Sequence, residues 1–365
     1  MTSTFEYNFP AIRGIQAGRE YYVAMCPLKL IPKIFLFDEE ESSLSPEVRA
    51  QRILNKGRIP ALTDYVIENK EDYVFSAITA SIDGKVKFEP IENNKQKFST
   101  NGQLRINMNA RFIINDGQHR RAAIEQAIKV EPDLGYESIA VVFFIDRGLE
   151  RSQQMFSDLN RHAVKPSRSL GLLYEHRNDM AKVSKLIAIQ SKAFQGLVEM
   201  ERSTLSERSR KLFTLSAIYT GCQALLEPLK FENYNNAYNT CNEYWSEVAE
   251  QFDDWKQVQN SKISSGEVRK DKIHAHALSL QCFGIVGSQL LREKKKDWKK
   301  VITKFKSINW NRSNAGVWEG RALIGGRISK TSSSVTLTTN YLKKMLGLKL
   351  NQTEQDIEKS FLKGK

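Results

Sequence analysis

The stretch FIINDGQHRRAAIEQAI, residues 112–128, constrains the fold more than any other part of the chain. An apolar run typical of a buried strand stops at Asn115-Asp116-Gly117, and a helix pattern begins directly after it. Further strand-like runs lie at residues 20–26, 33–37, 72–82, 104–109, 111–115 and 138–146, and two short helices are expected between residues 45 and 69. Because strands and helices alternate here, we predict a mixed α/β domain over residues 1–165.

Helical periodicity dominates the rest of the chain. Stretches with helix-like spacing of apolar residues begin at residues 167, 180, 210, 238 and 276. The polar stretch TSSSVTLTT, residues 331–339, is predicted to be a loop or an edge strand. A length of 365 residues is sufficient for two cores. The predicted fold class is therefore α+β, with a mainly α-helical domain over residues 166–365.

The charge balance favours a polyanionic partner. Lys and Arg outnumber Asp and Glu by 55 to 42, which gives a net charge of +13 and a pI near 9.4. A basic surface raises the rate of encounter with nucleic acid. The same charge would also suit a protein that is merely basic, so composition alone does not decide between these alternatives.

We expect a cytoplasmic protein without membrane contact. The apolar segments at 139–145 and 282–291 are shorter than the ~20 residues that a membrane span needs. The N-terminus lacks the basic and apolar regions of a signal peptide. Cysteines occur only at positions 26, 222, 241 and 282, without a C-x-x-C pair, so neither a disulfide scaffold nor a zinc knuckle is predicted.

The turn after the strand at 111–115 has the residues of an anion site. Asp116 is predicted to cap the helix, and Gly117 lets the backbone turn closely. Such a helix start has no intrahelical acceptors for its first amide groups, those of Gln118, His119 and Arg120. These donors and the positive end of the helix dipole attract negative charge.

The first turn of this helix is itself cationic, which opposes the helix dipole. His119, Arg120 and Arg121 stand where acidic residues are usually favoured. A phosphate would accept the N–H donors and the arginine forks together. The alternative is internal pairing, with Arg120 or Arg121 bound to a carboxylate such as Glu125 one turn further on.

Two segments of the second half combine basic and aromatic residues. REKKKDWKKVITKFK, residues 292–306, suits either a DNA-binding face or a surface helix docked by its apolar stripe. In WNRSNAGVWEGRALIGGRISK, residues 310–330, Trp310 and Trp318 are more readily core residues than nucleic-acid contacts. His274 and His276 are two positions apart, so we expect no metal site there. No catalytic residue is assigned, because P-loop, G-x-S-x-G and H-E-x-x-H motifs are absent from the sequence.

Asp116, Gly117, Gln118, His119 and Arg120 together spell DGQHR. With this motif and the stretches at 11–25, 51–66 and 155–169, the chain resembles the DGQHR-motif family, which includes the DndB-type DNA sulfur modification proteins. The four stretches occur in the family's order over about 160 residues, and the helical half resembles the family more diffusely.

More distantly, Gly117, Arg120 and Ala123 match the G-x-x-R-x-x-A signature of ParB-like domains. The resemblance implies a ParB/sulfiredoxin-like fold in which the loop cradles phosphate and a later asparagine-arginine pair, here Asn160-Arg161, completes the pocket. Sulfiredoxins place a reactive cysteine in this turn. The present chain has none there, so sulfiredoxin chemistry is not expected.

The resemblance implies a DNA-binding transcriptional regulator of a DNA phosphorothioation system, a function of DndB-type proteins. Implied partners are double-stranded DNA, other DNA sulfur modification proteins and, for a palindromic operator, a second copy in a homodimer. A regulator of this kind requires no cofactor. The alternative is a ParB-like nucleotide-binding or nucleotide-hydrolysing switch, or a nuclease, in which Asp116, His119 and Glu125 would hold Mg²⁺ with a bound nucleotide.

Overall fold

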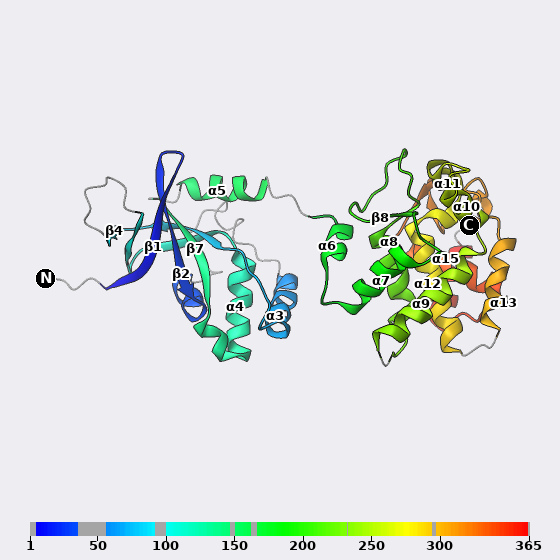
Figure 1. Ribbon diagram of the computed structural model, residues 1–365, viewed down its shortest axis with the longest axis horizontal. Helices are drawn as coiled ribbons and strands as arrows, with labels where there is room; N and C mark the ends of the chain where they lie inside the picture. The colour runs from blue at the N-terminus through cyan, green and yellow to red at the C-terminus, as the bar shows by residue number, and fades with distance from the viewer. Residues whose placement is uncertain are drawn as a thin grey trace. The chain divides into compact units, whose positions relative to one another are not determined.

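The computed structural model describes residues 5–35, 56–91, 100–146, 150–161, 166–231, 233–293 and 297–363. The chain divides into two compact units, residues 1–164 and 165–365 (Figure 1). A mixed sheet with helices builds the first unit, so the prediction of a mixed α/β fold is confirmed. Helices dominate the second unit.

The first unit is built on one large sheet. Among the described residues its strands are β1 (Glu6–Gln16), β2 (Arg19–Pro27), β3 (Ile78–Asp83), β4 (Val86–Pro90), β5 (Asn101–Asn107), β6 (Arg111–Asp116) and β7 (Ser138–Ile145), in the order β4-β5-β1-β2-β7-β3-β6. Neighbouring strands are antiparallel except β3 and β7, which are parallel. The helical segments are η1 (Leu28–Leu30), α1 (Ile31–Ile34), η2 (Lys56–Arg58), α3 (Ile59–Glu68), α4 (Gln118–Val130), η3 (Pro132–Tyr136) and α5 (Glu150–Arg161).

Helices α1 and α4 cover one face of this sheet. Ile78, Ala80 and Ile82 of β3 point to that face and are fully buried, and they share a core with Ile124 of α4. Helix α3 packs beside α4, where Thr63 Oγ1 donates to Gln126 Oε1 over 3.2 Å. Because α3 packs against α4, Arg58, the residue that precedes α3, lies near the start of α4.

Helix α5 lies on the opposite face (Figure 1). Ser81 alternates with the core residues of β3 and therefore points away from α4. Asn115 Nδ2 donates to Ser81 Oγ over 2.8 Å, and Ser152 Oγ of α5 donates to Asn115 Oδ1 over 2.5 Å. These three side chains are almost completely buried, so a hydrogen-bonded polar cluster fastens α5 to β6.

One strand prediction in this unit was wrong. The segment predicted as a strand over 33–37 begins inside α1, and its described part, through Phe35, contains no strand. Pro32 stands in the first turn of α1, where a missing N–H costs nothing. Ile31 and Ile34 are buried on one side of this turn, so its apolar residues serve a helical contact. The first of the two helices expected between 45 and 69 lies outside the described residues up to position 55.

The second unit is a helical assembly. Its described helical segments are α6 (Arg168–Tyr174), α7 (Asp179–Gln190), α8 (Leu215–Leu226), α9 (Tyr234–Ala249), α10 (Asp253–Gln259), α11 (Ser265–Asp271), η4 (Ile273–Ala275), α12 (Ala277–Arg292), α13 (Trp298–Ile302), η5 (Thr303–Ser307), α14 (Ala315–Trp318), α15 (Ser332–Leu346) and α16 (Gln352–Lys363). Two small sheets accompany them, formed by β8 (Val198–Glu199) with β9 (Phe213–Thr214) and by β10 (Leu323–Ile324) with β11 (Arg327–Ile328).

Helix α12 is the centre of this unit. Glycines at the crossing bring it into backbone contact with α8: a Cβ added to Gly284 would lie 2.3 Å from the carbonyl oxygen of Gly221. The four cysteines of the chain are free and buried, and Cys222 and Cys241 of this unit have their sulfurs 3.4 Å apart. Close helix contact explains why α12 is apolar around most of its circumference.

The prediction of a loop or an edge strand at 331–339 was wrong, because these residues begin α15. Thr331 caps the helix, with its side chain accepting from the amide of Ser334 over 3.1 Å. Val335, Thr338 and Thr339 are buried in the packed unit, with Val335 contacting Cys282 of α12 through its carbonyl. Burial thus overrides the low helix propensity of these branched residues.

The basic and aromatic segments contribute their aromatic residues to the core. Trp310 and Trp318 are buried and stack with ring centroids 5.3 Å apart. In the 292–306 segment, Ile302 and Phe305 are fully buried, which agrees with a segment docked by its apolar stripe. No helix within the described ranges combines the length and apolarity that a bilayer crossing demands.

His274 and His276 have separate structural partners. Trp255 Nε1 donates to His274 Nδ1 over 3.1 Å, and His274 Nε2 lies 3.1 Å from Asp254 Oδ2. His276 Nε2 lies 2.7 Å from the carbonyl oxygen of Arg269. Burial lowers the pKa of His276 to about 4, despite this hydrogen bond, and burial also lowers the pKa of His274.

We expect the helical unit to lose stability between about pH 6.5 and pH 4. In this range His276 takes up a proton in the unfolded chain, whose histidine pKa is near 6.5, and stays neutral in the folded one. The free energy of unfolding should therefore fall with falling pH, by as much as about 3 kcal/mol from this residue. All five tryptophans belong to this unit, so tryptophan fluorescence during urea denaturation measures it selectively. His276→Gln should make the free energy of unfolding less dependent on pH. An unchanged pH profile in this variant would contradict the role given to His276.

Candidate nucleic-acid and anion site

The turn between β6 and α4 depends on a left-handed glycine. Gly117 precedes the helix with φ of 106°, and a Cβ there would lie 3.0 Å from Ile78 Cγ1. Only glycine adopts this conformation readily and leaves this space. The prediction that Asp116 caps α4 was wrong, because the N-cap residue is Gly117 and no side chain caps the helix.

The start of α4 presents the predicted amide groups. The first hydrogen bond within the helix runs from the N–H of Arg121 to the carbonyl of Gly117 over 2.9 Å. The amides of Gln118, His119 and Arg120 precede this bond, so the helix supplies no acceptor for them. Helix α4 has no acidic residue in its first turn, and the positive end of its dipole is therefore not offset from within that turn.

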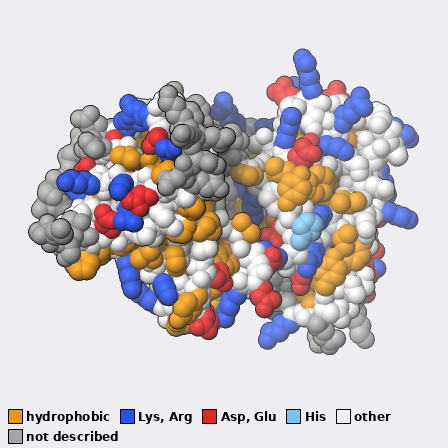
Figure 2. All heavy atoms as spheres, turned by 60° about the vertical axis from the view of Figure 1, so that its left-hand side comes forward, with side chains coloured by type: hydrophobic (Ala, Val, Ile, Leu, Met, Phe, Trp, Pro, Cys, Tyr) orange, Lys and Arg blue, Asp and Glu red, His pale blue; other side chains and the backbone are white. Residues whose placement is uncertain are grey.

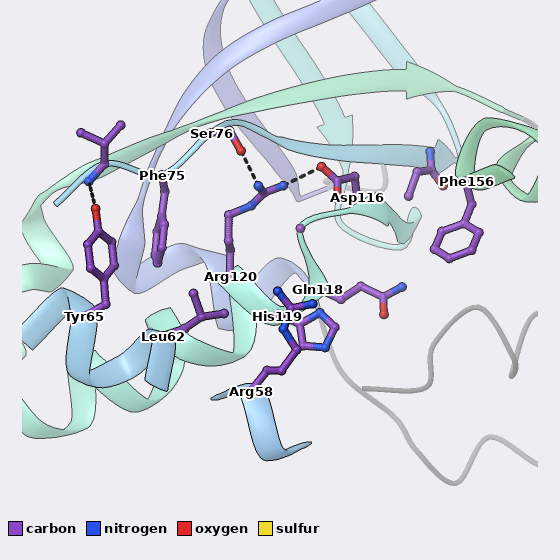
Figure 3. A pocket seen from close by; sticks show the side chains of 13 residues that line it. Arg58, Leu62, Tyr65, Phe75, Ser76, Asp116, Gln118, His119, Arg120 and Phe156 are labelled. Carbon is purple, nitrogen blue, oxygen red and sulfur yellow. Dashed lines mark hydrogen bonds and ion pairs between the residues drawn. The ribbon is translucent and has the colours of Figure 1, made fainter. Parts of the chain in front are cut away.

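Arg120 is braced from two sides. Its Nη2 lies 2.7 Å from Asp116 Oδ2 and donates to the carbonyl of Ala77 over 3.2 Å, while Nη1 donates to Ser76 Oγ (Figure 3). Its side chain keeps 18% of its exposure, and the carboxylate of Asp116 keeps 48%. The guanidinium is therefore fixed in position at a surface that a ligand can reach.

Arg121 points elsewhere. Its Nη1 lies 2.5 Å from Glu125 Oε2, and its Nε donates to the carbonyl of Phe35 over 2.9 Å. The residue is 6% exposed. Both arginines thus have an internal carboxylate, as the alternative of internal pairing predicts, but Arg121 is used to fasten α1 to α4. We therefore retain Arg120 and omit Arg121 from the residues proposed to bind phosphate.

A cavity of about 500 Å³ opens beside Arg120. It is lined by Arg58, Leu62, Tyr65, Val74, Phe75, Ser76, Asn115, Asp116, Gly117, Gln118, His119, Arg120 and Phe156. The turn residues Asp116 to Arg120 all belong to this lining, so the DGQHR motif forms one wall. The volume lies within the range of small-ligand sites, about 300–1,000 Å³.

Three cationic or basic side chains converge on this cavity. Arg58, the last residue of η2, approaches His119 from below, and Arg120 lies above them (Figure 3). Burial lowers the pKa of His119, and the positive charges of Arg58 and Arg120 lower it further. His119 is therefore neutral near pH 7, and an anion placed between the two arginines would raise its pKa.

Aromatic side chains form the other walls. Tyr65 and Phe75 stand together on one side, with ring centroids 6.1 Å apart, and Tyr65 Oη accepts from the amide of Val74 over 2.9 Å. Phe156 of α5 stands on the other side, beyond Gln118 (Figure 3). A planar ring system can stack on such surfaces while its charged group meets the cations.

Sequence reasoning missed Arg58, Tyr65, Phe75, Ser76 and Phe156. A signal for three of them existed, since Arg58 and Tyr65 lie in the stretch at 51–66 and Phe156 in that at 155–169, both of which carry the family resemblance. What the sequence does not reveal is that these stretches meet at the DGQHR turn. Asn160 and Arg161 end α5, but their side chains lie outside the described residues, and their closing role stays a prediction.

Two of the three residues considered as Mg²⁺ ligands are held in ion pairs. Asp116 binds Arg120, and Glu125 binds Arg121 and Lys129. Within the described ranges, no group of three or more His, Cys, Asp or Glu side chains is arranged to hold a metal ion. The described lining of the cavity thus combines cations, amide donors and aromatic rings.

Comparison with known families agrees with the motif. The family model described as DndB, DNA-sulfur modification-associated, matches residues 9–349. No curated protein and no solved structure matches the chain. The match spans both units and almost the whole length, and it includes the DGQHR turn and every residue that lines the cavity. The chain therefore belongs to the DndB family, whose members are associated with the sulfur modification of DNA.

Proposed function

We propose that this protein is a DNA-binding transcriptional regulator of a DNA sulfur modification system, and that its DGQHR turn binds a phosphate group. The observation that carries the proposal is the convergence of Arg58, His119 and Arg120 on an open cavity at the start of α4. Membership of the DndB family supports a role in the sulfur modification of DNA. The net charge of +13 supports a polyanionic partner.

The general charge does not locate the DNA by itself. Lysine and arginine side chains are scattered over the visible faces of both units, among acidic and apolar ones (Figure 2). The cavity is distinct because its cations stand together, with amide donors beside them. We propose a cytoplasmic homodimer on a palindromic operator, and other DNA sulfur modification proteins as further partners.

We also propose that the first unit is ParB-like. The G-x-x-R-x-x-A residues Gly117, Arg120 and Ala123 lie on a strand-turn-helix within a mixed sheet, as that resemblance implies. Gly117 supplies the turn and Arg120 the guanidinium. Ala123 is fully buried, so its small side chain allows α4 to pack closely.

A second candidate function is a nucleotide-binding switch in the same cavity. The aromatic walls favour it, because Tyr65, Phe75 and Phe156 surround a space that suits one nucleotide and not a duplex. Hydrolysis is not included in this candidate, since Asp116 and Glu125 are each paired with an arginine.

Substituting Arg58 tests the phosphate site without breaking an internal ion pair of the described residues. We expect Arg58→Ala to weaken duplex DNA binding about tenfold at moderate salt, and to reduce the slope of log K against log salt by about one. Lys85→Ala removes another exposed cation, outside the cavity, and should leave affinity for DNA near the native value. Fluorescence anisotropy over a salt titration measures both. Equal losses for the two variants would refute a specific site, and stoichiometric nucleotide binding without DNA binding would favour the switch.

Anion binding should be linked to protonation of His119. Because the phosphodiester does not titrate between pH 5 and 8, a rise in DNA affinity as pH falls toward the lowered pKa of His119 in the protein without DNA reports the uptake of a proton there. His119→Gln should bind with a weaker dependence on pH. NMR titration of the imidazole, with and without DNA, provides a direct reading. An imidazole pKa that DNA leaves unchanged would place the phosphate elsewhere.

A further inference from the structure

The segment at 310–330 separates into a buried and an exposed part. Its tryptophans belong to the core, and Arg321 is buried against Glu358, with Nη2 2.5 Å from Oε1. Arg312 and Arg327, in contrast, are not buried. The exposed part centres on the hairpin of β10 and β11, for which the proposed function has no role.

The hairpin turns through two left-handed glycines. Gly325 and Gly326 have φ of 57° and 71°, as a two-residue type I′ turn requires. Leu323 pairs with Ile328, and Ile324 pairs with Arg327. Leu323 is buried at 2% exposure, so the Ile324–Arg327 pair is displayed on the opposite, outer side. Ile324 keeps 56% of its exposure.

The tip of the hairpin extends into open space and is held by hydrogen bonds. A Cβ added to Gly325 or Gly326 would meet no atom within 4 Å. The Glu319 carboxylate accepts from the amides of both glycines, over 2.5 and 3.2 Å. Arg312 Nη2 donates to the carbonyl of Gly326 over 2.8 Å. Two-stranded hairpins are marginal by themselves, and here side chains from outside the hairpin fix the turn.

The surroundings of the tip are cationic. Arg327 and Lys330 are exposed and Arg312 is half-buried, whereas Glu319 is bonded to the turn. Because these cations surround a turn whose neighbouring carboxylate is already hydrogen-bonded, an anion at this place would be favourable. An exposed aliphatic side chain beside an arginine is the combination with which proteins enter the minor groove of DNA.

We propose that the β10–β11 hairpin is a DNA-binding wing of the helical unit. Ile324 and Arg327 enter the minor groove of duplex DNA, and Arg312 and Lys330 contact the phosphates beside it. This inference rests on the proposed DNA binding, but it places a DNA contact on a surface separate from the DGQHR turn. It also accounts for an isoleucine that keeps 56% of its exposure beside a braced turn.

The test compares paired variants of the full-length chain on an A·T-rich duplex of about 25 base pairs. Arg327→Ala and Ile324→Ser should each weaken binding about tenfold. Arg327→Lys and Ile324→Leu keep the charge or the apolar wedge, and should retain more of the affinity than their partners. Lys192→Ala removes an exposed cation just after α7 and should have little effect. Melting temperatures should match the native protein, since both hairpin side chains are exposed.

Competition identifies the groove. Netropsin, which occupies the A·T minor groove, should displace the native protein, and this sensitivity should diminish in Ile324→Ser. If the native protein binds DNA and the hairpin variants bind equally well, the wing is refuted while the proposed function stands. If the native protein binds no duplex at all, the proposed function fails first. Lower melting temperatures with unchanged DNA affinity would show that the hairpin serves stability alone.

Discussion

The ion pair between Asp116 and Arg120 is the interaction on which the candidate site depends. One partner ends β6 and the other stands in the first turn of α4, so the pair spans the tight turn that Gly117 makes possible. Ser76 and the carbonyl of Ala77 hold the same guanidinium from the segment before β3. The arginine is thereby fixed beside the cavity before any ligand arrives, and little side-chain entropy is left to lose on binding.

The two arginines of the motif illustrate how one helix turn serves two purposes. Arg120 faces the cavity, while Arg121, one position further around the helix, is buried between α4 and α1. A charge as deeply placed as that of Arg121 is tolerated because Glu125 and backbone carbonyls surround it. The sequence alone suggests that Arg120 and Arg121 both bind phosphate, because it does not reveal which side of α4 packs against the rest of the unit.

The two units have different physical characters. The first unit offers cations, amide donors and aromatic rings around a hollow, which suits recognition of one phosphate or nucleotide. The second buries Trp245, Trp255, Trp310 and Trp318 and exposes Arg327 on the β10–β11 hairpin. The two proposals assign a phosphate site to the first unit and a groove contact to the second, and the family match covers both units.

The sequence by itself determined the local features: the strand, turn and helix around DGQHR, the helical character after residue 166 and the family. The first two depend on neighbouring residues, so periodicity and one glycine suffice to reveal them, and the family follows from the motif and the stretches that resemble it. Only the tertiary structure decided which distant residues join the turn. Arg58 and Phe156 reach the cavity because α3 packs on α4 and α5 is fastened to Asn115. Likewise TSSSVTLTT is helical because it packs in the core near α12, and burial of this kind is a property of the whole fold and not of the residues themselves.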